Sequence, residues 1–124
     1  MPIQTFSCII VDDESFSVRL LKEYVKNSEQ LVLMQTFNDP QLAMDYILYN
    51  HQVDILFSDL EMPNLSGIEL AEAVQQKVKH IVFVTSSLKL QIQAPKITKW
   101  HYLGKPVSFD DFRKMLNSLI DPTV

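Results

Sequence analysis

Short apolar segments alternate with segments of helical periodicity five times along this chain. The apolar segments are Phe6–Val11, Leu31–Phe37, Val53–Ser58, His80–Val84 and Trp100–Leu103. Phe6–Val11 and His80–Val84 are continuous apolar runs of strand length, as expected for strands that are buried on both faces. This alternation requires parallel strands joined by right-handed crossovers, with helices on both faces of one sheet. The fold class is therefore α/β, with a five-stranded parallel sheet.

The segments between these strands predict the helices. Helical spacing or capping signals predict helices over Ser15–Asn27, from Pro40 to about Tyr49, from the end of a loop with Pro63, Asn64 and Gly67 to about Val78, and from the cap Ser108 to Ile120. The remaining segment, Leu88–Gln93, predicts only a short helix because Pro95 breaks the pattern. A chain of 124 residues suits one domain. We assign residues 1–120 to it and residues 121–124 to a tail or linker.

Polar residues follow four of the predicted strands at the point where each strand ends. Asp12 and Asp13 follow the first strand, Asp59 the third, Thr85 the fourth and Lys105 the fifth. In an open parallel sheet, the ligand site lies outside the carboxyl ends of the strands. Three acids, a hydroxyl and an amine are therefore expected to share one site.

That set of side chains suits Mg²⁺-assisted phosphorylation of an aspartate. A divalent cation would neutralise the clustered carboxylates, and Mg²⁺ prefers oxygen ligands. An aspartate can act as a nucleophile toward phosphorus, while Lys105 and Thr85 would stabilise the phosphoryl oxygens. Taken singly, each residue has a plainer reading: a helix cap for an acid, a structural hydroxyl for Thr85, a solvated amine for Lys105.

Composition excludes several other functions. Cys8 is the single cysteine, so no disulfide framework exists and a reduced, cytoplasmic chain is expected. The net charge of −4 argues against direct nucleic-acid binding. With 2 glycines there is no Gly-rich phosphate loop, and no apolar stretch is long enough to span a bilayer. No signal peptide is expected, because no charged segment followed by an apolar one is found. The 3 histidines are scattered, and none is assigned a catalytic role.

Four motifs together resemble the receiver domain of bacterial two-component response regulators. They are Ile-Ile-Val-Asp12-Asp13-Glu14, Asp59-Leu-Glu-Met-Pro63 with Gly67, Val-Phe-Val-Thr85-Ser86, and Tyr102-Leu-Gly-Lys105-Pro106. The resemblance covers essentially the whole chain. It implies a flavodoxin-like (βα)5 fold with strand order 2-1-3-4-5.

The resemblance also implies a role for each matching residue. Asp59 would be the phosphoacceptor for a sensor histidine kinase. Mg²⁺ would be bound by Asp13 directly, by Asp12 mainly through water, by Asp59, and by the backbone carbonyl of Glu61. Lys105 would pair with the phosphoryl group. The switch would consist of Thr85, moving toward the phosphoryl group, and Tyr102, rotating inward.

The stretches around these motifs are similar to receivers that precede a LytTR-type DNA-binding domain. We therefore expect a role in transcription regulation through a C-terminal output domain outside this chain, and phosphorylation-dependent homodimers are a further possibility. Two departures concern the signalling surface. Ser86 stands where receivers usually carry Ala or Gly, and Leu88–Trp100 lacks the usual small residues and contains Pro95.

Two other functions stay open at this stage. One is an interaction scaffold on a receiver-like fold that works without phosphorylation, favoured by the unusual segment before the fifth strand. The other is a phosphohydrolase of the haloacid-dehalogenase kind, which needs a second acid two residues after the nucleophile. Glu61 occupies that position. We expect a signalling domain and not an enzyme, because the sequence offers neither a cap domain nor an evident substrate pocket.

Overall fold

The computed structural model describes residues 4–49, 52–86, 97 and 99–121. Its elements are β1 (Phe6–Val11), α1 (Ser15–Lys26), β2 (Leu31–Phe37), α2 (Pro40–Tyr49), β3 (Val53–Ser58), α3 (Gly67–Val74), a 3-10 turn (Gln75–Lys77), β4 (Val78–Thr85), β5 (His101–Gly104) and α4 (Phe109–Ile120). The short helix predicted at Leu88–Gln93 and the break predicted at Pro95 fall outside the described residues.

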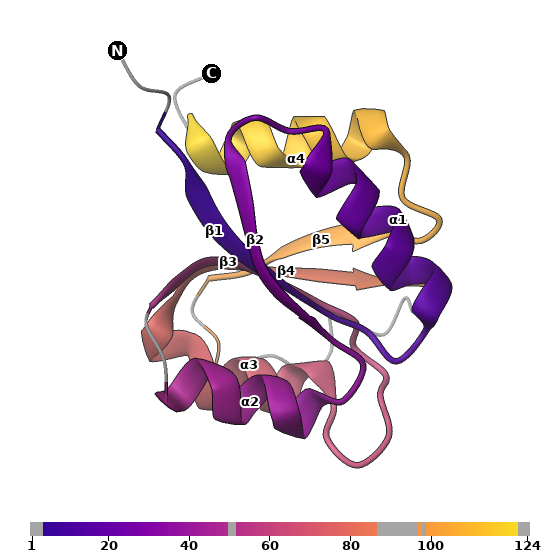
Figure 1. Cartoon of the computed structure of the whole chain (residues 1–124). Helices are drawn as coiled ribbons and strands as arrows, with labels where there is room; N and C mark the ends of the chain where they lie inside the picture. The colour runs from indigo at the N-terminus through magenta and orange to yellow at the C-terminus, as the bar shows by residue number, and fades with distance from the viewer. Residues whose placement is uncertain (1–3, 50–51, 87–96, 98, 122–124) are drawn as a thin grey trace.

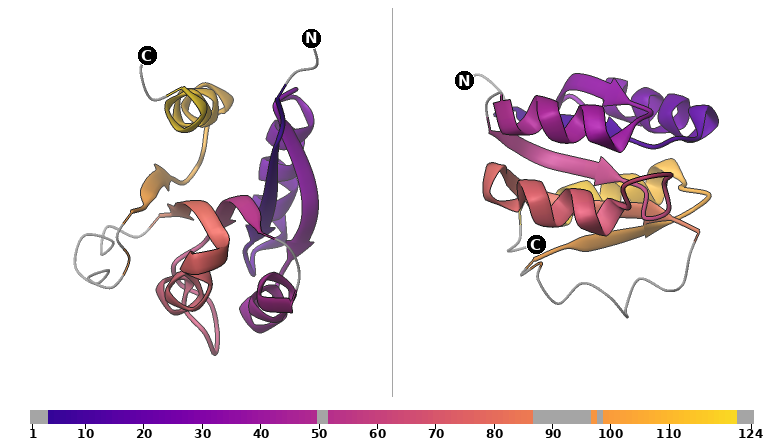
Figure 2. Two further views of the ribbon diagram at one scale, coloured as in Figure 1. Left: turned by 90° about the vertical axis from the view of Figure 1, so that its left-hand side faces the viewer. Right: turned by 90° about the horizontal axis from the view of Figure 1, so that it is seen from below.

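The five strands form one parallel sheet in the order β2-β1-β3-β4-β5, as predicted. Helices α1 and α4 cover one face, and α2 and α3 cover the other (Figure 1). The two further views show the same three layers from the side and from below (Figure 2). Because all five strands run the same way, their carboxyl ends meet at one edge of the sheet.

Each face of the sheet has its own core. Ile9, Leu56 and Phe83 belong to the core beneath α2 and α3, whereas Ile10 and Phe57 belong to the core beneath α1 and α4. Neighbouring residues of one strand thus enter opposite cores, since side chains alternate along a strand. This double burial of β1, β3 and β4 is the reason that these strands read as apolar runs, whereas β2 and β5 at the sheet edges are only partly buried.

Helix starts follow their sequence signals. Ser108 caps α4, and its hydroxyl accepts a hydrogen bond from the Asp111 N–H at 3.0 Å. Ser66 caps α3 in a capping box with Glu69, whose carboxylate accepts the Ser66 N–H at 3.0 Å. The Asp39 carboxylate accepts the Gln41 N–H at 2.9 Å, where α2 begins with Pro40. Such caps satisfy N–H groups that have no partner inside the helix.

The predicted boundary between the third helix and the fourth strand is wrong. The helix was expected to reach about Val78, but α3 ends at Val74, and β4 begins at Val78, two residues before the predicted start at His80. The reason is that Val78 pairs with Val53 and is buried against the sheet. The chain must therefore leave the helix through the 3-10 turn to reach this register.

Candidate phosphoacceptor site

Backbone hydrogen bonds carry the ends of β1 and β3 one residue past the last strand position. The Asp12 N–H donates to the Phe37 carbonyl at 3.0 Å, and the Asp59 N–H donates to the Val11 carbonyl at 3.1 Å. Both aspartates are thereby fixed at the same edge of the sheet. Asp12 is 1% exposed and Asp59 is 8% exposed, while Asp13 is exposed.

Three of the predicted residues lie together as a carboxylate cluster. Asp12, Asp13 and Asp59 each offer one oxygen, and these oxygens lie within 4.8 Å of one another. Burial raises the pKa of Asp12, because the charged form loses its hydration, although Lys105 opposes this effect. An array of this kind is costly without a cation, and its all-oxygen donor set is the one Mg²⁺ prefers.

Lys105 is the cation that the fold itself brings to the cluster. Its Nζ lies 2.8 Å from Asp12 Oδ2, 3.3 Å from Asp59 Oδ2 and 3.5 Å from Glu14 Oε1. Burial on its own would lower the pKa of Lys105, but the ion pairs with Asp12 and Asp59 together outweigh this effect and raise that pKa. The pairing with Asp12 is an ion pair without hydrogen-bond geometry at Oδ2, so this buried oxygen has no hydrogen-bond partner among the described residues. The cluster as a whole, with three carboxylates beside one ammonium, fits an additional cation.

The chain positions Lys105 through its backbone. The Lys105 N–H donates to the Thr85 carbonyl at 3.1 Å, which extends the pairing of β4 and β5 by one step. Thr85 is 2% exposed at the end of β4. Tyr102 also reaches this residue, because its hydroxyl donates to the Thr85 carbonyl at 3.4 Å. The two residues predicted to form the switch are therefore in contact.

The loop after β3 holds Asp59 tightly. The Asp59 Oδ1 accepts the Leu60 N–H at 2.7 Å, and the Leu60 carbonyl accepts the Gly67 N–H at 2.8 Å. A Cβ on Gly67 would lie 1.9 Å from the Asp59 carbonyl oxygen, so only glycine permits this approach. Within the loop, Asn64 adopts φ 73°, a left-handed conformation that asparagine tolerates. Glu61 lies in the same loop with an exposed side chain.

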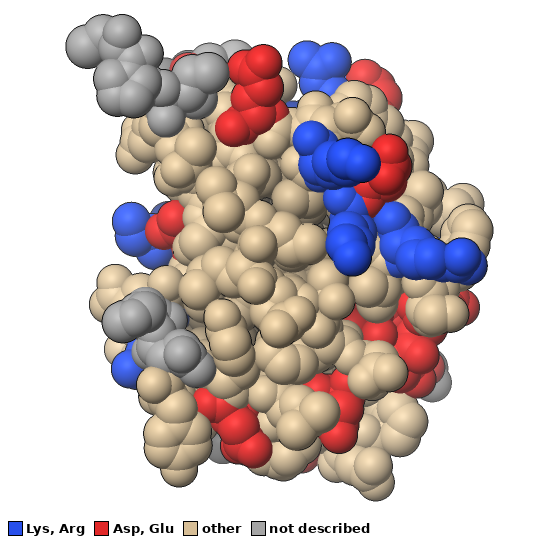
Figure 3. All heavy atoms as spheres, in the orientation of Figure 1, with Lys and Arg blue, Asp and Glu red and all other residues tan. Residues whose placement is uncertain are grey.

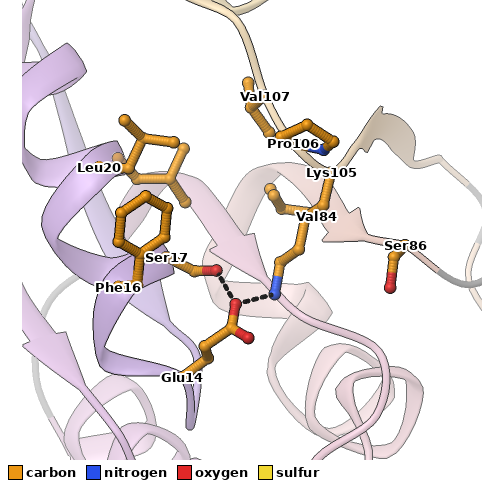
Figure 4. Close-up of a pocket in the computed structure, with 10 residues that line it drawn as sticks. Glu14, Phe16, Ser17, Leu20, Val84, Ser86, Lys105, Pro106 and Val107 are labelled. Atoms are coloured by element: carbon orange, nitrogen blue, oxygen red, sulfur yellow. Dashed lines mark hydrogen bonds and ion pairs between the residues drawn. The ribbon is translucent and has the colours of Figure 1, made fainter.

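Sequence reasoning missed the role of Glu14. Its carboxylate accepts a hydrogen bond from the Ser17 hydroxyl and lies beside the Lys105 ammonium, as Figure 4 shows. The pKa of this exposed carboxyl is lowered, chiefly by the Ser17 bond and then by the charge of Lys105. The acidic run Asp12-Asp13-Glu14 marked the right neighbourhood but could not show which acid contacts the lysine.

A cavity of about 270 Å³ lies beside Lys105, between α1 and the loop that follows β5. Phe16, Leu20 and Val107 line it, with Lys105 and Ser86 at its edge (Figure 4). Phe16 is 61% exposed, which is unusual for a phenylalanine. The cavity gives the carboxylate cluster an apolar neighbour that is open to a partner.

The remaining reactive side chains lie elsewhere. Cys8 is fully buried, and burial raises the pKa of its thiol to about 12, so it is an unreactive core residue. His80 and His101 lie with ring centroids 6.3 Å apart, away from the strand ends that carry the cluster. None of the helices in the described part of the chain is long and apolar enough to cross a membrane.

A doubly wound parallel sheet with acids after β1 and β3 and a lysine after β5 defines the class of aspartate-centred receiver domains. The chain belongs to the response regulator receiver domain family, whose sequence model matches residues 8–117. It is therefore the receiver domain of a response regulator of two-component signalling.

Several known proteins are similar to this chain. The transcriptional regulatory protein YpdB of Escherichia coli is 29% identical over 113 residues, which cover 90% of this chain and 46% of YpdB. An uncharacterized response regulatory protein of Vibrio cholerae is 31% identical over 118 residues, covering 92% of this chain and 48% of that protein. The chain thus spans about half the length of the curated relatives it matches.

A solved structure supports the same fold. The response regulatory domain of protein MrkE from Klebsiella pneumoniae superimposes with a TM-score of 0.83 at 26% identity. The match covers 94% of this chain and 96% of that domain. Receiver domains are signalling domains that bind Mg²⁺ in an acidic pocket and interact with histidine kinases or phosphotransfer proteins.

Proposed function

We propose that Asp59 accepts a phosphoryl group from the phosphohistidine of a sensor histidine kinase. The observation that carries this proposal is the contact between the Lys105 Nζ and Asp59 Oδ2 at 3.3 Å, inside a cluster of three carboxylates. Asp59 is the member of the cluster at the end of the central strand β3, and its Oδ1 is already oriented by the Leu60 N–H.

The transfer needs no other covalent partner. A carboxylate oxygen of Asp59 forms a bond to phosphorus, and the P–N bond of the donor breaks. Its electron pair stays on the imidazole nitrogen, and the product is an acyl phosphate. Lys105 would then pair with a phosphoryl oxygen, since its ammonium already lies beside the carboxylate that attacks phosphorus. The Thr85 hydroxyl would donate a hydrogen bond to a second phosphoryl oxygen.

Mg²⁺ would be held by Asp12, Asp13, Asp59 and the backbone carbonyl of Glu61. The fit rests on the oxygen donor set, three carboxylates whose oxygens lie within 4.8 Å of one another beside one lysine ammonium. When bound, the ion would neutralise charge on the transferring phosphoryl group. Asp12 would hold it mainly through water and Asp13 directly.

Signalling would follow from the change in charge at Asp59. Thr85 and Tyr102 would respond together, because the Tyr102 hydroxyl already bonds the Thr85 carbonyl. We propose that the response controls a C-terminal DNA-binding domain, with the LytTR type as the leading candidate. The name of the relative YpdB, a transcriptional regulatory protein, supports an output in transcription. A phosphorylation-dependent homodimer and a cytoplasmic location belong to the same proposal.

The kinase would approach along α1. On the face shown in Figure 3, lysine and arginine side chains gather over this helix, which carries Arg19, Lys22 and Lys26. The exposed Phe16 lies at the end of α1 that is nearest the site. A partner with a mixed acidic and apolar surface would suit both features.

The test is the intact mass of the chain after acetyl phosphate and Mg²⁺, with Asp59→Asn and an EDTA control. One phosphoryl adduct that requires both Asp59 and the metal is expected. A folded chain that gains no adduct from acetyl phosphate or from a phosphorylated histidine kinase would refute the proposal and favour the scaffold. Repeated turnover of a phosphomonoester would instead favour the phosphohydrolase, so p-nitrophenyl phosphate is included as a substrate.

A further inference from the structure

A single hydrogen bond ties α1 to the loop that carries Lys105. The Tyr24 hydroxyl donates to the Val107 carbonyl at 2.7 Å, joining residues 83 positions apart in the sequence. The Tyr24 ring packs against Phe109 and Phe112, with centroids at 5.2 and 5.5 Å. These contacts hold the ring and so fix the direction in which its hydroxyl points.

The Val107 carbonyl is not part of the α4 hydrogen-bond pattern, so the Tyr24 hydroxyl provides its hydrogen-bond donor. Val107 precedes the capping residue Ser108, and the first α4 hydrogen bond runs from the Phe112 N–H to the Ser108 carbonyl. The Val107 carbonyl therefore lies outside the helix, while its side chain is 5% exposed and packs in the core. A carbonyl next to buried apolar groups loses hydration and is stabilised by a hydrogen bond.

The loop is thus held at both ends. The Lys105 N–H bonds the Thr85 carbonyl at one end, and the Val107 carbonyl bonds Tyr24 at the other. Pro106 lies between them, and its ring restricts φ. With both ends fixed, the backbone of Lys105 has a defined place, from which its Nζ reaches Asp12 and Asp59 at 2.8 and 3.3 Å.

We propose that Tyr24 is a positioning residue for Lys105 in phosphoryl transfer to Asp59. The proposal rests on the proposed function of Asp59. Tyr24 touches neither the carboxylates nor the phosphoryl group, and it acts through the three-residue loop Lys105–Val107. Loss of its hydroxyl lets this loop move away from α1, and the ammonium moves with it.

The test uses Tyr24→Phe, which keeps the ring and its contacts with Phe109 and Phe112 and removes only the hydroxyl. Two variants serve as controls. Tyr49→Phe removes a hydroxyl from a tyrosine that is 87% exposed. Ile47→Val removes a methylene from a fully buried residue in the core on the opposite face of the sheet, and so lowers stability without touching the loop.

Phosphorylation is followed by intact mass over a range of acetyl phosphate concentrations at saturating Mg²⁺. Tyr24→Phe is expected to lower the maximal rate about tenfold, since a displacement of about 1 Å can cost about 100-fold. Its Mg²⁺ affinity, measured by amide NMR, should not fall below that of wild type, because the carboxylates are untouched and a displaced ammonium opposes the cation less. Both controls should keep the wild-type rate, although Ile47→Val lowers the melting temperature.

A rate for Tyr24→Phe equal to that of Ile47→Val at matched stability would overturn the proposal, since Tyr24 would then be merely structural. The ¹⁵N resonance of the Lys105 ammonium provides a readout without phosphorylation. It should shift in Tyr24→Phe and stay unchanged in both controls, and an unchanged resonance would also overturn the proposal. If wild type gains no adduct, the proposed function of Asp59 fails, and this resonance alone decides whether Tyr24 positions the lysine.

Discussion

Replacing Lys105 by methionine tests how the carboxylate cluster is held. Methionine keeps most of the length of the lysine side chain and removes its charge. Asp12 is 1% exposed and lies 2.8 Å from the Lys105 Nζ, so the change leaves a buried carboxylate without its cation. Breaking a buried pair in this way costs about 3–5 kcal/mol. Because Asp12 can bind a proton instead, we expect the lower end, about 3 kcal/mol.

Lys79→Met is the matched control. Lys79 pairs with Asp54 at 3.6 Å, but its side chain is 65% exposed. An exposed pair contributes about 0.2–1 kcal/mol, so this variant should unfold close to wild type. For a domain of this size, about 3 kcal/mol corresponds to roughly 10 °C in the melting temperature. Urea unfolding in EDTA and thermal unfolding followed by circular dichroism would measure both differences.

Mg²⁺ and pH provide two further arms of the same experiment. A divalent cation would replace the missing positive charge, so saturating Mg²⁺ should stabilise Lys105→Met more than wild type. The difference in unfolding free energy between the two proteins should therefore decrease. Loss of Lys105 also removes an effect that lowers the pKa of Asp12, which burial already raises. In folded Lys105→Met, Asp12 then holds a proton that it releases when the chain unfolds. The difference in stability between this variant and wild type should therefore become smaller as the pH falls from 7.5 to 5. This reasoning would be refuted if Lys105→Met were as stable in EDTA as Lys79→Met. It would also be refuted if Mg²⁺ left the difference in stability between wild type and Lys105→Met unchanged.

Two other predictions concern the loop after β3 and the pair of histidines. Gly67→Ala should lower the free energy of unfolding by about 1–3 kcal/mol or more, because the new Cβ would lie 1.9 Å from the Asp59 carbonyl oxygen. Gly104→Ala is the control, since its Cβ approaches the Tyr102 side chain, with the hydroxyl nearest at 3.1 Å, and it should cost under about 0.5 kcal/mol. Equal urea midpoints for the two variants would contradict this prediction. Desolvation lowers the pKa of His80 and His101 below the ordinary value of 6.5, so the unfolded state binds more protons and stability should fall as the pH drops from 7 to 5.5. The slope cannot exceed about 1.4 kcal/mol per pH unit for each histidine, and it should be smaller because both side chains are partly exposed. His101→Gln should flatten this loss; parallel pH profiles for wild type and His101→Gln would exclude the histidine pair as the source.

The sequence predicted the sheet and the edge that carries the site for a physical reason. A parallel strand buried on both faces is recognisable as an apolar run, and the residue after it must lie at the common edge. Asp12, Asp59 and Lys105 could therefore be assigned to one site without any knowledge of their contacts. The end of α3 could not be predicted, because Gln75–Lys77 continues the helical pattern and only the pairing of Val78 with Val53 decides where β4 begins.

Long-range contacts made by side chains could not be predicted from the sequence. The bond from Tyr24 to Val107 spans 83 positions and has no local signal, since a tyrosine at a helical core position predicts only packing. The contact of Glu14 with Lys105 depends on how α1 begins, where Glu14 occupies the capping position. Such contacts follow from the placement of whole elements, and residue type alone does not select them.

The charge balance of the cluster explains why phosphorylation would act as a switch here. Asp12, Asp13 and Asp59 carry three negative charges against the single ammonium of Lys105, so the site favours a divalent cation. With that ion bound, carboxylates and cations balance. A phosphoryl group on Asp59 would replace one negative charge by about −1.5 to −2 and add oxygens that accept hydrogen bonds. The groups that can interact with this additional negative charge are the Lys105 ammonium and the Thr85 hydroxyl. The position of Lys105 depends on its loop, and the backbone carbonyl of Thr85 accepts a hydrogen bond from Tyr102. A small excess of charge at one strand end would in this way reach β4, β5 and the start of α4 together.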